Sequence, residues 1–322
     1  EFVPAALLNN ILSGGKNSDE VQVQLTADKM NFSSDSVIPS IDSLPPVSLK
    51  HPDNPLQKFL DSLRYSKGQI RIIYYGDSQI EGDRITSFLR HTLRKGHGGT
   101  GPGLFLPLMP VMYTESVWLR SSSNWKKYNY LSYKTGEISH SNLGPFMAIC
   151  RYLPEGEKTS VPEKAFVRIR PSNVADSASA DFDILRVFYG NMEDIVNVLV
   201  KADDNEVLAD TLKNGRGFYE ITCPLKGAKD VLIEFSGKVS PDIYGISIES
   251  KNGVIVDNIP QRGSAGLEFT MVDRDNLSES YKKLSPDLFI LHYGLNIVKN
   301  VRDDYLYYQK GLGRQLSLLR EI

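Results

Sequence analysis

The chain has 322 residues, 41% of them hydrophobic, which is enough for two domains with a sizeable core. Its formal net charge is −2, and lysines, arginines and acids are interspersed, so the composition does not indicate a nucleic-acid partner. No apolar run approaches the roughly eighteen residues that a membrane-spanning helix needs. No Cys or His cluster has metal-ligand spacing, and we expect neither a metal nor a cofactor.

The first fifty residues differ in composition from the rest of the chain. Residues 1–52 are rich in Ser, Asp, Asn and Pro, and we expect them to form a linker or extended arm. Apolar residues at helical spacing predict a helix over 54–65. The sequence begins with Glu1, so we expect that a leading segment, such as a signal peptide, has been removed.

The most informative segment is 71–80, RIIYYGDSQI. A β-branched and aromatic run stops at Gly76, Ser78 follows two residues later, and a helical pattern opens at Asp83. This order predicts a strand, a sharp turn and a helix, with the Ser78 hydroxyl at the carboxyl edge of a sheet near the positive end of a helix dipole. We expect Asp77 to stabilise the turn and Asp83 to be an N-cap. The alternative is a Gly-Asp-Ser turn that only connects two elements.

A glycine-rich run follows the predicted helix. Five of the eight residues in 96–103 are glycine, which excludes helix and strand and predicts a close-packed loop. A phosphate-binding loop is the competing interpretation. It is disfavoured because no Lys-Ser/Thr follows and because the run trails a helix instead of opening one.

Three blocks of sequence together resemble the SGNH (GDSL-type) hydrolases. The first is Gly76-Asp77-Ser78 with Asp83 and the loop at 98–103; the second is 257–263, DNIPQRG; the third is 287–296, DLFILHYGLN. The resemblance covers residues 69–106 and 253–322, about half of the chain. It is closest to the branch that contains peptidoglycan and polysaccharide O-acetylesterases.

The resemblance implies a role for several residues. Ser78 would be the nucleophile, and its amide, the amide of Gly263 and the side-chain amide of Asn296 would form the oxyanion hole. Gly76 and Asp77 would support them. Losing one such donor typically costs about 3–4 kcal/mol of barrier. Two plainer interpretations remain: Gly263 as an ordinary turn glycine, and Asn296 as the cap of a helix predicted over 303–320.

The general base is the point where the sequence departs from the family. The family keeps this base on an Asp-x-x-His block near the carboxyl end, and none of the five histidines, at 51, 91, 97, 140 and 292, fits that pattern. A serine at its free pKa is a poor nucleophile without an adjacent base. Three explanations stay open: the chain is a fragment, it is a degenerate member that binds without cleaving, or His97 or His292 substitutes. A structural role suits both of these histidines better.

The middle of the chain has a different pattern. From Tyr113 to about Ser250 there is no good helix pattern, and short alternating segments predict an antiparallel β-sandwich. The predicted strands are 146–153, 164–170, 183–189, 195–201, 217–222, 231–235 and 243–249. Cys150 and Cys223 fall in them, either as one disulfide or as two buried thiols.

The O-acetylesterase branch has such an inserted domain, similar to a carbohydrate-binding module. Aromatic side chains of the insert suit the C–H faces of sugar rings, although core packing is the alternative for each one. These aromatic residues are Trp118, Trp125, Tyr128, Tyr130 and Tyr133.

The expected fold is therefore α/β: a flavodoxin-like three-layer α/β/α SGNH domain from 53–112 and 253–322, incomplete at its carboxyl end, with the sandwich inserted at 113–252. The resemblance implies a secreted or periplasmic serine esterase that removes small acyl groups, with acetyl first, from an O-acylated polysaccharide or cell-wall glycan. The alternatives are a glycan-binding protein that has lost its base and a sugar O-acyltransferase. The sugar, the acyl chain and the oligomeric state stay open.

Overall fold

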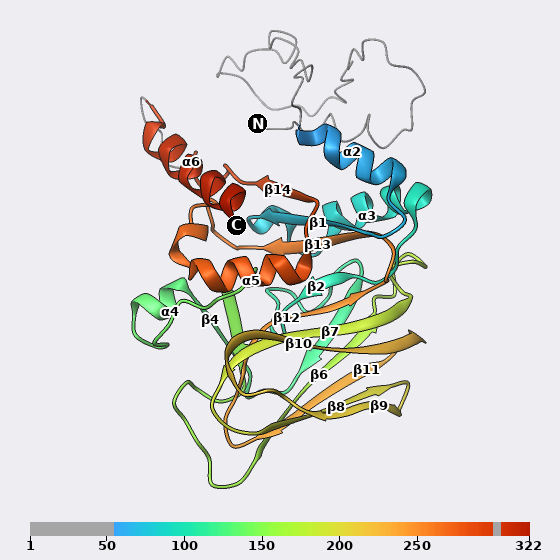
Figure 1. Ribbon diagram of the computed structural model, residues 1–322, viewed down its shortest axis with the longest axis vertical. Coiled ribbons are helices and arrows are strands. Elements are labelled where there is room, and N and C mark those ends of the chain that lie inside the picture. The colour runs from blue at the N-terminus through green and yellow to red at the C-terminus, as the bar shows by residue number, and fades with distance from the viewer. Residues whose placement is uncertain (1–54, 299–303) are drawn as a thin grey trace, which may run out of the picture. The chain divides into compact units, whose positions relative to one another are not determined.

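The computed structural model describes residues 55–298 and 304–322 (Figure 1). The arm expected at 1–52 lies outside the described residues. Residues 61–322 form one compact unit, and the fold below is that of this unit. Helix α2 (Pro55–Tyr65) leads into its first strand and matches the helix predicted at 54–65 over the described positions.

A three-stranded parallel sheet carries the motifs of the first, second and third blocks. Its order is β13-β1-β14, with bounds Gly253–Pro260, Gln69–Gly76 and Leu288–His292. The last residue of β1, Gly76, lies opposite Pro260 on one side and His292 on the other. The carboxyl ends of all three strands therefore meet at one edge, on the left in Figure 1.

Helices pack around this sheet. α3 (Arg84–His97) lies against β13, where Arg94 Nε donates to Val254 O at 2.9 Å. α5 (Arg274–Leu284) lies against β1, where the hydroxyls of Tyr281 and Tyr75 are 2.7 Å apart. α6 (Leu306–Glu321) follows β14. The architecture is thus mixed α/β, as expected, while the three-layer flavodoxin-like arrangement stays a prediction.

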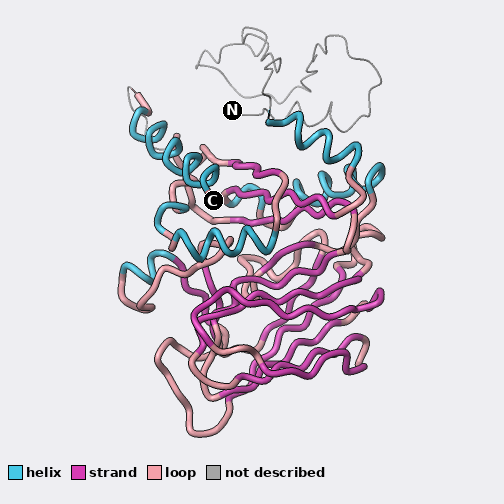
Figure 2. Tube along the Cα trace, viewed as in Figure 1, coloured by secondary structure: helices cyan, strands magenta, loops and turns pink. Residues whose placement is uncertain are grey.

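Two antiparallel sheets make up most of the rest (Figure 2). One has the order β10-β7-β12-β5-β4, with β2 also paired to β12, and the other has the order β3-β6-β11-β8-β9. Strands of the first sheet are β2 (Gly103–Phe105), β4 (Lys126–Asn129), β5 (Ala148–Arg151), β7 (Phe182–Met192), β10 (Gly215–Ala228) and β12 (Asp242–Glu249). Strands of the second are β3 (Val117–Ser121), β6 (Glu163–Pro171), β8 (Val196–Ala202), β9 (Asn205–Thr211) and β11 (Val231–Gly237). All seven predicted strands are present.

Several local predictions need correction. Two helices were not predicted: α5, and the five-residue α4 (Tyr130–Lys134) within the region expected to lack helices. The glycine run is a loop only in its middle, because Gly96 still belongs to α3 and Gly103 opens β2.

The prediction that this run packs closely is confirmed. A Cβ on Gly99 would lie 2.5 Å from Val254 O, and one on Gly101 would lie 2.2 Å from Ile248 O. Both glycines also have a positive φ, of 107° and 83°. Only glycine fits such positions without moving the backbone of β12 or β13.

Both cysteines of the middle region, and several of its aromatic side chains, are buried. Cys150 and Cys223 are free thiols, and burial raises their pKa values to about 12 and about 11. Trp125 and Tyr128 are core residues. Of the predicted sugar-stacking side chains, Trp118 and Tyr130 are half-buried and only Tyr133 is exposed.

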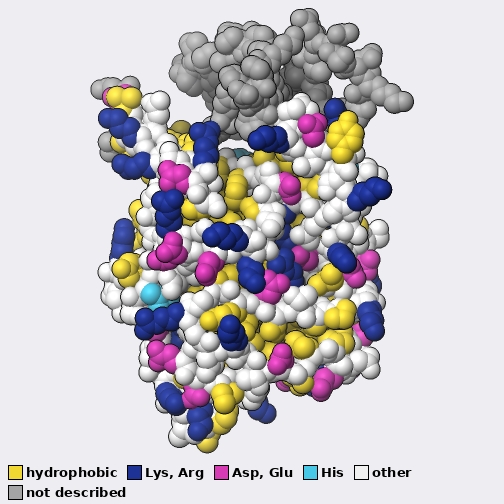
Figure 3. Space-filling view, in the orientation of Figure 1, with side chains coloured by type: hydrophobic (Ala, Val, Ile, Leu, Met, Phe, Trp, Pro, Cys, Tyr) yellow, Lys and Arg dark blue, Asp and Glu magenta, His cyan; other side chains and the backbone are white. Residues whose placement is uncertain are grey.

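Charged side chains of both signs are interspersed over the face shown in Figure 3. No helix in the described ranges combines the length and the apolar character that crossing a bilayer requires. Within those same ranges, no three His, Cys, Asp or Glu side chains are grouped so that they could hold a metal ion.

Candidate active site

The turn after β1 places Ser78 at the carboxyl edge of the sheet. A Cβ on Gly76 would lie 3.0 Å from His292 O, so a larger residue there would require the end of β14 to move by a few tenths of an ångström. Buried Asp77 accepts a hydrogen bond from Gln79 N at Oδ1 (2.9 Å) and so caps the 3₁₀ helix η2 (Ser78–Ile80). The predicted turn-stabilising role of Asp77 is confirmed. Ser78 is the first residue of η2 and is exposed.

The loop after β13 lies beside this turn. Gln261 N donates to Gly76 O at 2.8 Å, which extends the pairing of β13 and β1 by one residue. Arg262 donates from Nε and Nη2 to the two carboxylate oxygens of Glu81, at 2.8 and 2.6 Å. The exposed Gly263 follows, with a φ of 76°. Two hydrogen-bonded links thus hold its turn against the segment that carries Ser78.

Asn296 connects the third block to the other two. Its Nδ2 donates to Asp77 Oδ2 at 3.0 Å and to Ser264 O at 2.8 Å. The side chain therefore does not cap α6, which begins ten residues later at Leu306. Both hydrogens of the amide are engaged, so donation to a substrate oxygen requires that it share one of them.

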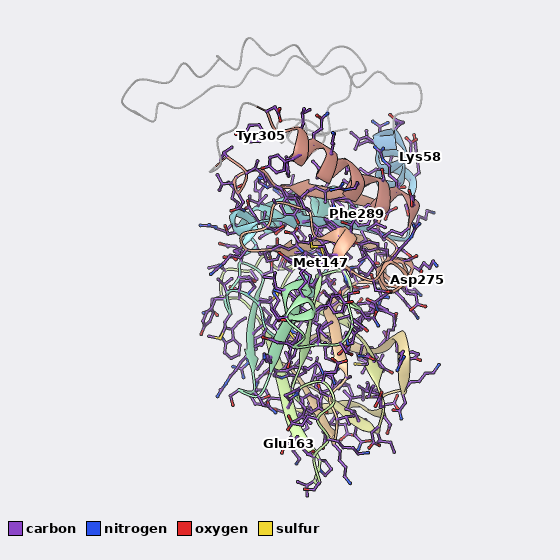
Figure 4. The ribbon with its side chains drawn as sticks, turned by 90° about the vertical axis from the view of Figure 1, so that its left-hand side faces the viewer. Lys58, Met147, Glu163, Asp275, Phe289 and Tyr305 are labelled. Atoms are coloured by element: carbon purple, nitrogen blue, oxygen red, sulfur yellow. The ribbon has the colours of Figure 1, made fainter. Side chains whose placement is uncertain are left out.

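Sequence reasoning missed the part that Gln261 plays at this edge. Its Oε1 accepts a hydrogen bond from the Tyr293 hydroxyl, and its Nε2 lies 3.3 Å from Met147 Sδ and 3.5 Å from Phe146 O. The side chain thus links the end of β14 to the segment before β5. Figure 4 looks onto this side, with Met147 near its centre and Phe289 of β14 above it. The available signal was the position of Gln261 inside the second block.

Asp83 lies at the predicted N-cap position, but its side chain does not cap the helix. It occupies the N-cap position of α3, with a φ of 67°, but its side chain makes no cap hydrogen bond. Its carboxylate instead accepts hydrogen bonds from Arg90 (3.0 Å), Thr86 and Ser116. Asp83 and Arg90 are both buried, so this ion pair fixes the end of the Ser78 loop from inside the protein.

A buried ionic network underlies the same sheet. Arg71 of β1 donates to Asp257 Oδ2 at 2.7 Å and also binds Glu249 of β12. Burial alone would raise the pKa of Glu249, but Arg71 and Arg186 lower it to about 2. Burial raises the pKa of Asp257 against the attraction of Arg71. The network ties the parallel sheet to the antiparallel sheet that contains β12.

None of the described histidines contacts Ser78. His97 ends the fourteen-residue α3, about 20 Å along the helix from its first turn. His292 Nδ1 lies 3.0 Å from the Tyr74 hydroxyl. His140 pairs with Glu155 and Asp242 at 3.4 and 3.3 Å. The two remaining histidines are His91, which is exposed, and His51, which lies outside the described residues.

The edge of the sheet therefore brings together Ser78, Gly263 and Asn296 from three distant parts of the sequence. It offers an exposed hydroxyl at the start of a 3₁₀ helix and a glycine turn hydrogen-bonded to that segment. It also offers a carboxamide held by Asp77. Such a set could present one nucleophile and several N–H donors to a single carbonyl group.

Comparison with known proteins gives one informative match. No protein-family model and no curated protein sequence matches the chain. Among solved structures, a peptidoglycan O-acetylesterase matches with a TM-score of 0.58 and 19% identity, covering 83% of this chain and 68% of that one. A cleaved adhesin domain of Lys-gingipain from Porphyromonas gingivalis (13% identity, 41% and 96% covered) has a TM-score of 0.26. The catalytic unit of an α-1,3-glucanase from Streptomyces thermodiastaticus (11% identity, 39% and 26% covered) has 0.23. Only the first value is high enough to indicate a shared fold, so this chain has a fold similar to that of the O-acetylesterase.

Proposed function

We propose that this protein is an SGNH-type serine esterase that removes small acyl groups, acetyl first, from a polysaccharide or cell-wall glycan outside the cytoplasm. The observation that carries the proposal is the convergence of three loops at one sheet edge. Gln261 N is bonded to Gly76 O, and Asn296 Nδ2 is bonded to Asp77 Oδ2. The fold shared with a peptidoglycan O-acetylesterase supports the choice of substrate class and of location.

In this proposal Ser78 Oγ attacks the ester carbonyl carbon, and the hydroxyl proton passes to a base. The carbonyl oxygen becomes an oxyanion that accepts hydrogen bonds from the amides of Ser78 and Gly263 and from Asn296. Collapse breaks the bond to the sugar oxygen, which leaves as a protonated hydroxyl. Water then hydrolyses the acyl-Ser78 ester to release the acid and restore the serine.

A second candidate is a glycan-binding protein with this fold and no turnover. The observation that favours it is the position of the histidines, since among the described residues none lies within hydrogen-bonding distance of Ser78. A serine without a base is a weak nucleophile. The two candidates differ in whether Ser78 supports turnover at all.

The test is hydrolysis of p-nitrophenyl acetate by the full-length protein and by Ser78→Ala. Loss of a catalytic serine costs at least about 10³-fold in kcat for a serine hydrolase, and we expect a loss of that order. Ser123→Ala, another exposed serine, is the matched control and should keep the wild-type rate. Equal rates for wild type and Ser78→Ala would remove the esterase and leave the binding protein. Acetyl transfer to an added sugar in excess of acetate release would instead identify a transferase.

A further inference from the structure

Helix α4 stands beside the candidate site although it belongs to the β-rich part of the chain. It lies on the side where β1, β13 and β14 end, on the left in Figure 1 and facing the viewer as the green coil of Figure 4. Asn129 Oδ1 caps it by accepting hydrogen bonds from Leu131 N (2.9 Å) and Ser132 N (3.3 Å). Thr135 Oγ1 donates to Leu131 O at its other end. The short helix is therefore fixed at both ends.

One face of α4 contacts the segment that follows Gly263. Lys134 Nζ lies 3.9 Å from Met271 Sδ and 5.4 Å from the centre of the Tyr130 ring. Burial raises the pKa of Tyr130, and the charge of Glu268 raises it further. Glu268 in turn accepts a hydrogen bond from Ser264 Oγ at 2.6 Å. The segment that follows Gly263 therefore lies close to α4 at Met271, and the charge of Glu268 acts on Tyr130.

Tyr133 is the aromatic side chain that this arrangement leaves open to solvent. It is 44% exposed, and it follows Tyr130 by three residues, so the two rings lie on the same side of the helix. The Lys134 ammonium covers the Tyr130 ring, whereas no ring or cation contact of Tyr133 is found in the described part of the chain. Trp125 and Tyr128 are buried in the core and cannot serve a ligand.

We propose that the Tyr133 ring is a stacking subsite for a pyranose ring of the glycan chain, next to the sugar that carries the acyl group. The placement of this subsite next to the acylated sugar rests on the proposed function, whereas the binding experiment that tests it needs no esterase activity. Aromatic rings bind the apolar C–H face of a pyranose, and Tyr133 presents its ring to solvent on a capped helix that contacts the segment after Gly263. The β-rich part then contributes to substrate binding through α4, at the edge of the candidate site.

Binding and turnover test the subsite separately. Isothermal titration with the N-acetylglucosamine hexamer and with xylohexaose, on the Ser78→Ala protein, measures binding without hydrolysis and distinguishes the two kinds of glycan. We expect Tyr133→Ala to weaken binding of at least one hexamer about tenfold, as loss of one stacked ring does. Tyr133→Phe should bind normally. Tyr65→Ala, which changes an exposed tyrosine before β1 at the opposite end of that strand, should not affect binding.

In the protein that retains Ser78, Tyr133→Ala should raise KM for an acetylated polysaccharide and leave the rate on p-nitrophenyl acetate unchanged. The subsite is refuted if neither hexamer binds, or if Tyr133→Ala binds as tightly as its parent. If the hexamers bind through Tyr133 while Ser78→Ala hydrolyses p-nitrophenyl acetate as fast as wild type, the esterase fails and the subsite stands.

Discussion

Replacing Glu249 by glutamine tests the buried ionic network under the candidate site. Glu249 is 3% exposed, pairs with Arg71 and with Arg186 (3.0 Å), and also accepts hydrogen bonds from Gln69 (3.0 Å) and Ser247. The glutamine keeps the shape of the side chain and removes its charge. The variant therefore imitates the protonated form of Glu249 at every pH.

The magnitude follows from the pKa of Glu249, which Arg71 and Arg186 lower against burial from an ordinary 4.5 to about 2. One pH unit in pKa corresponds to about 1.4 kcal/mol, so the ionised form contributes at most about 3 kcal/mol to the free energy of unfolding at pH 7. The variant recovers part of this stabilisation. The charge of Glu249 also raises the pKa of Asp257, so removing that charge favours ionised Asp257. We therefore expect Glu249→Gln to lose about 2–3 kcal/mol at pH 7.

The sign of the pH dependence follows from the lowered pKa. The stabilisation by Glu249 is fully present above pH 4.5 and is lost as the pH falls towards 2. At pH 3 somewhat less than half of the wild-type advantage should remain, about 1 kcal/mol. Asp257, whose pKa burial raises, contributes in the opposite direction in both proteins, and it contributes less in the variant because the charge of Glu249 no longer raises that pKa.

Urea unfolding at pH 7 and pH 3, followed by tryptophan fluorescence, measures both values. Glu206→Gln, on the exposed strand β9, is the control and should change the free energy of unfolding by less than about 0.5 kcal/mol. A difference between wild type and Glu249→Gln that is the same at both pH values would refute the reasoning. So would a difference below about 1 kcal/mol at pH 7.

Two further substitutions test the packing of the glycine run and the site. Gly101→Ala should destabilise the fold by more than about 3 kcal/mol, because its Cβ would lie 2.2 Å from Ile248 O and its φ is positive. The control is Gly96→Ala, in α3 with open space around it, which should be neutral or stabilise the fold by up to about 1 kcal/mol. Equal melting temperatures for the two would contradict this packing. Asn296→Ala should lower kcat on p-nitrophenyl acetate about 10²- to 10³-fold while the far-UV circular dichroism stays native. A rate within threefold of wild type would limit Asn296 to holding Asp77.

The sequence was sufficient where local patterns decide structure. The run that ends at Gly76, followed by Ser78 and a helical pattern, predicted β1, the turn and α3 because strand and helix periodicities differ. Seven of the ten strands from β3 to β12 were found for the same reason, and β3, β4 and β9 were not predicted. Strand β9 was missed because four of its seven residues are charged or polar and it lies exposed at the edge of a sheet, so it has no buried face to produce alternation.

Helix α5 was missed although a signal was present. Leu277, Tyr281 and Leu284 are spaced as one helical face, and Asp273 caps the helix by accepting a hydrogen bond from Asn276 N. Its high content of charged and polar residues concealed this stripe. The stripe is buried against the sheet, with Tyr281 bonded to the Tyr75 hydroxyl of β1. Tertiary packing, more than local propensity, stabilises such a helix.

The polar contacts that hold the candidate site together could not be read from the sequence. Arg71 reaches carboxylates 178 and 186 residues away, and Asn296 reaches Asp77 across 219 residues. No periodicity records such pairs, because each depends on how β1 pairs with β13 and β14 or packs against β12. The pairing of the strands therefore sets the relative positions of the three loops. Substitutions that shift β13 or β14 against β1 should lower the rate of ester hydrolysis even when they touch none of these loops.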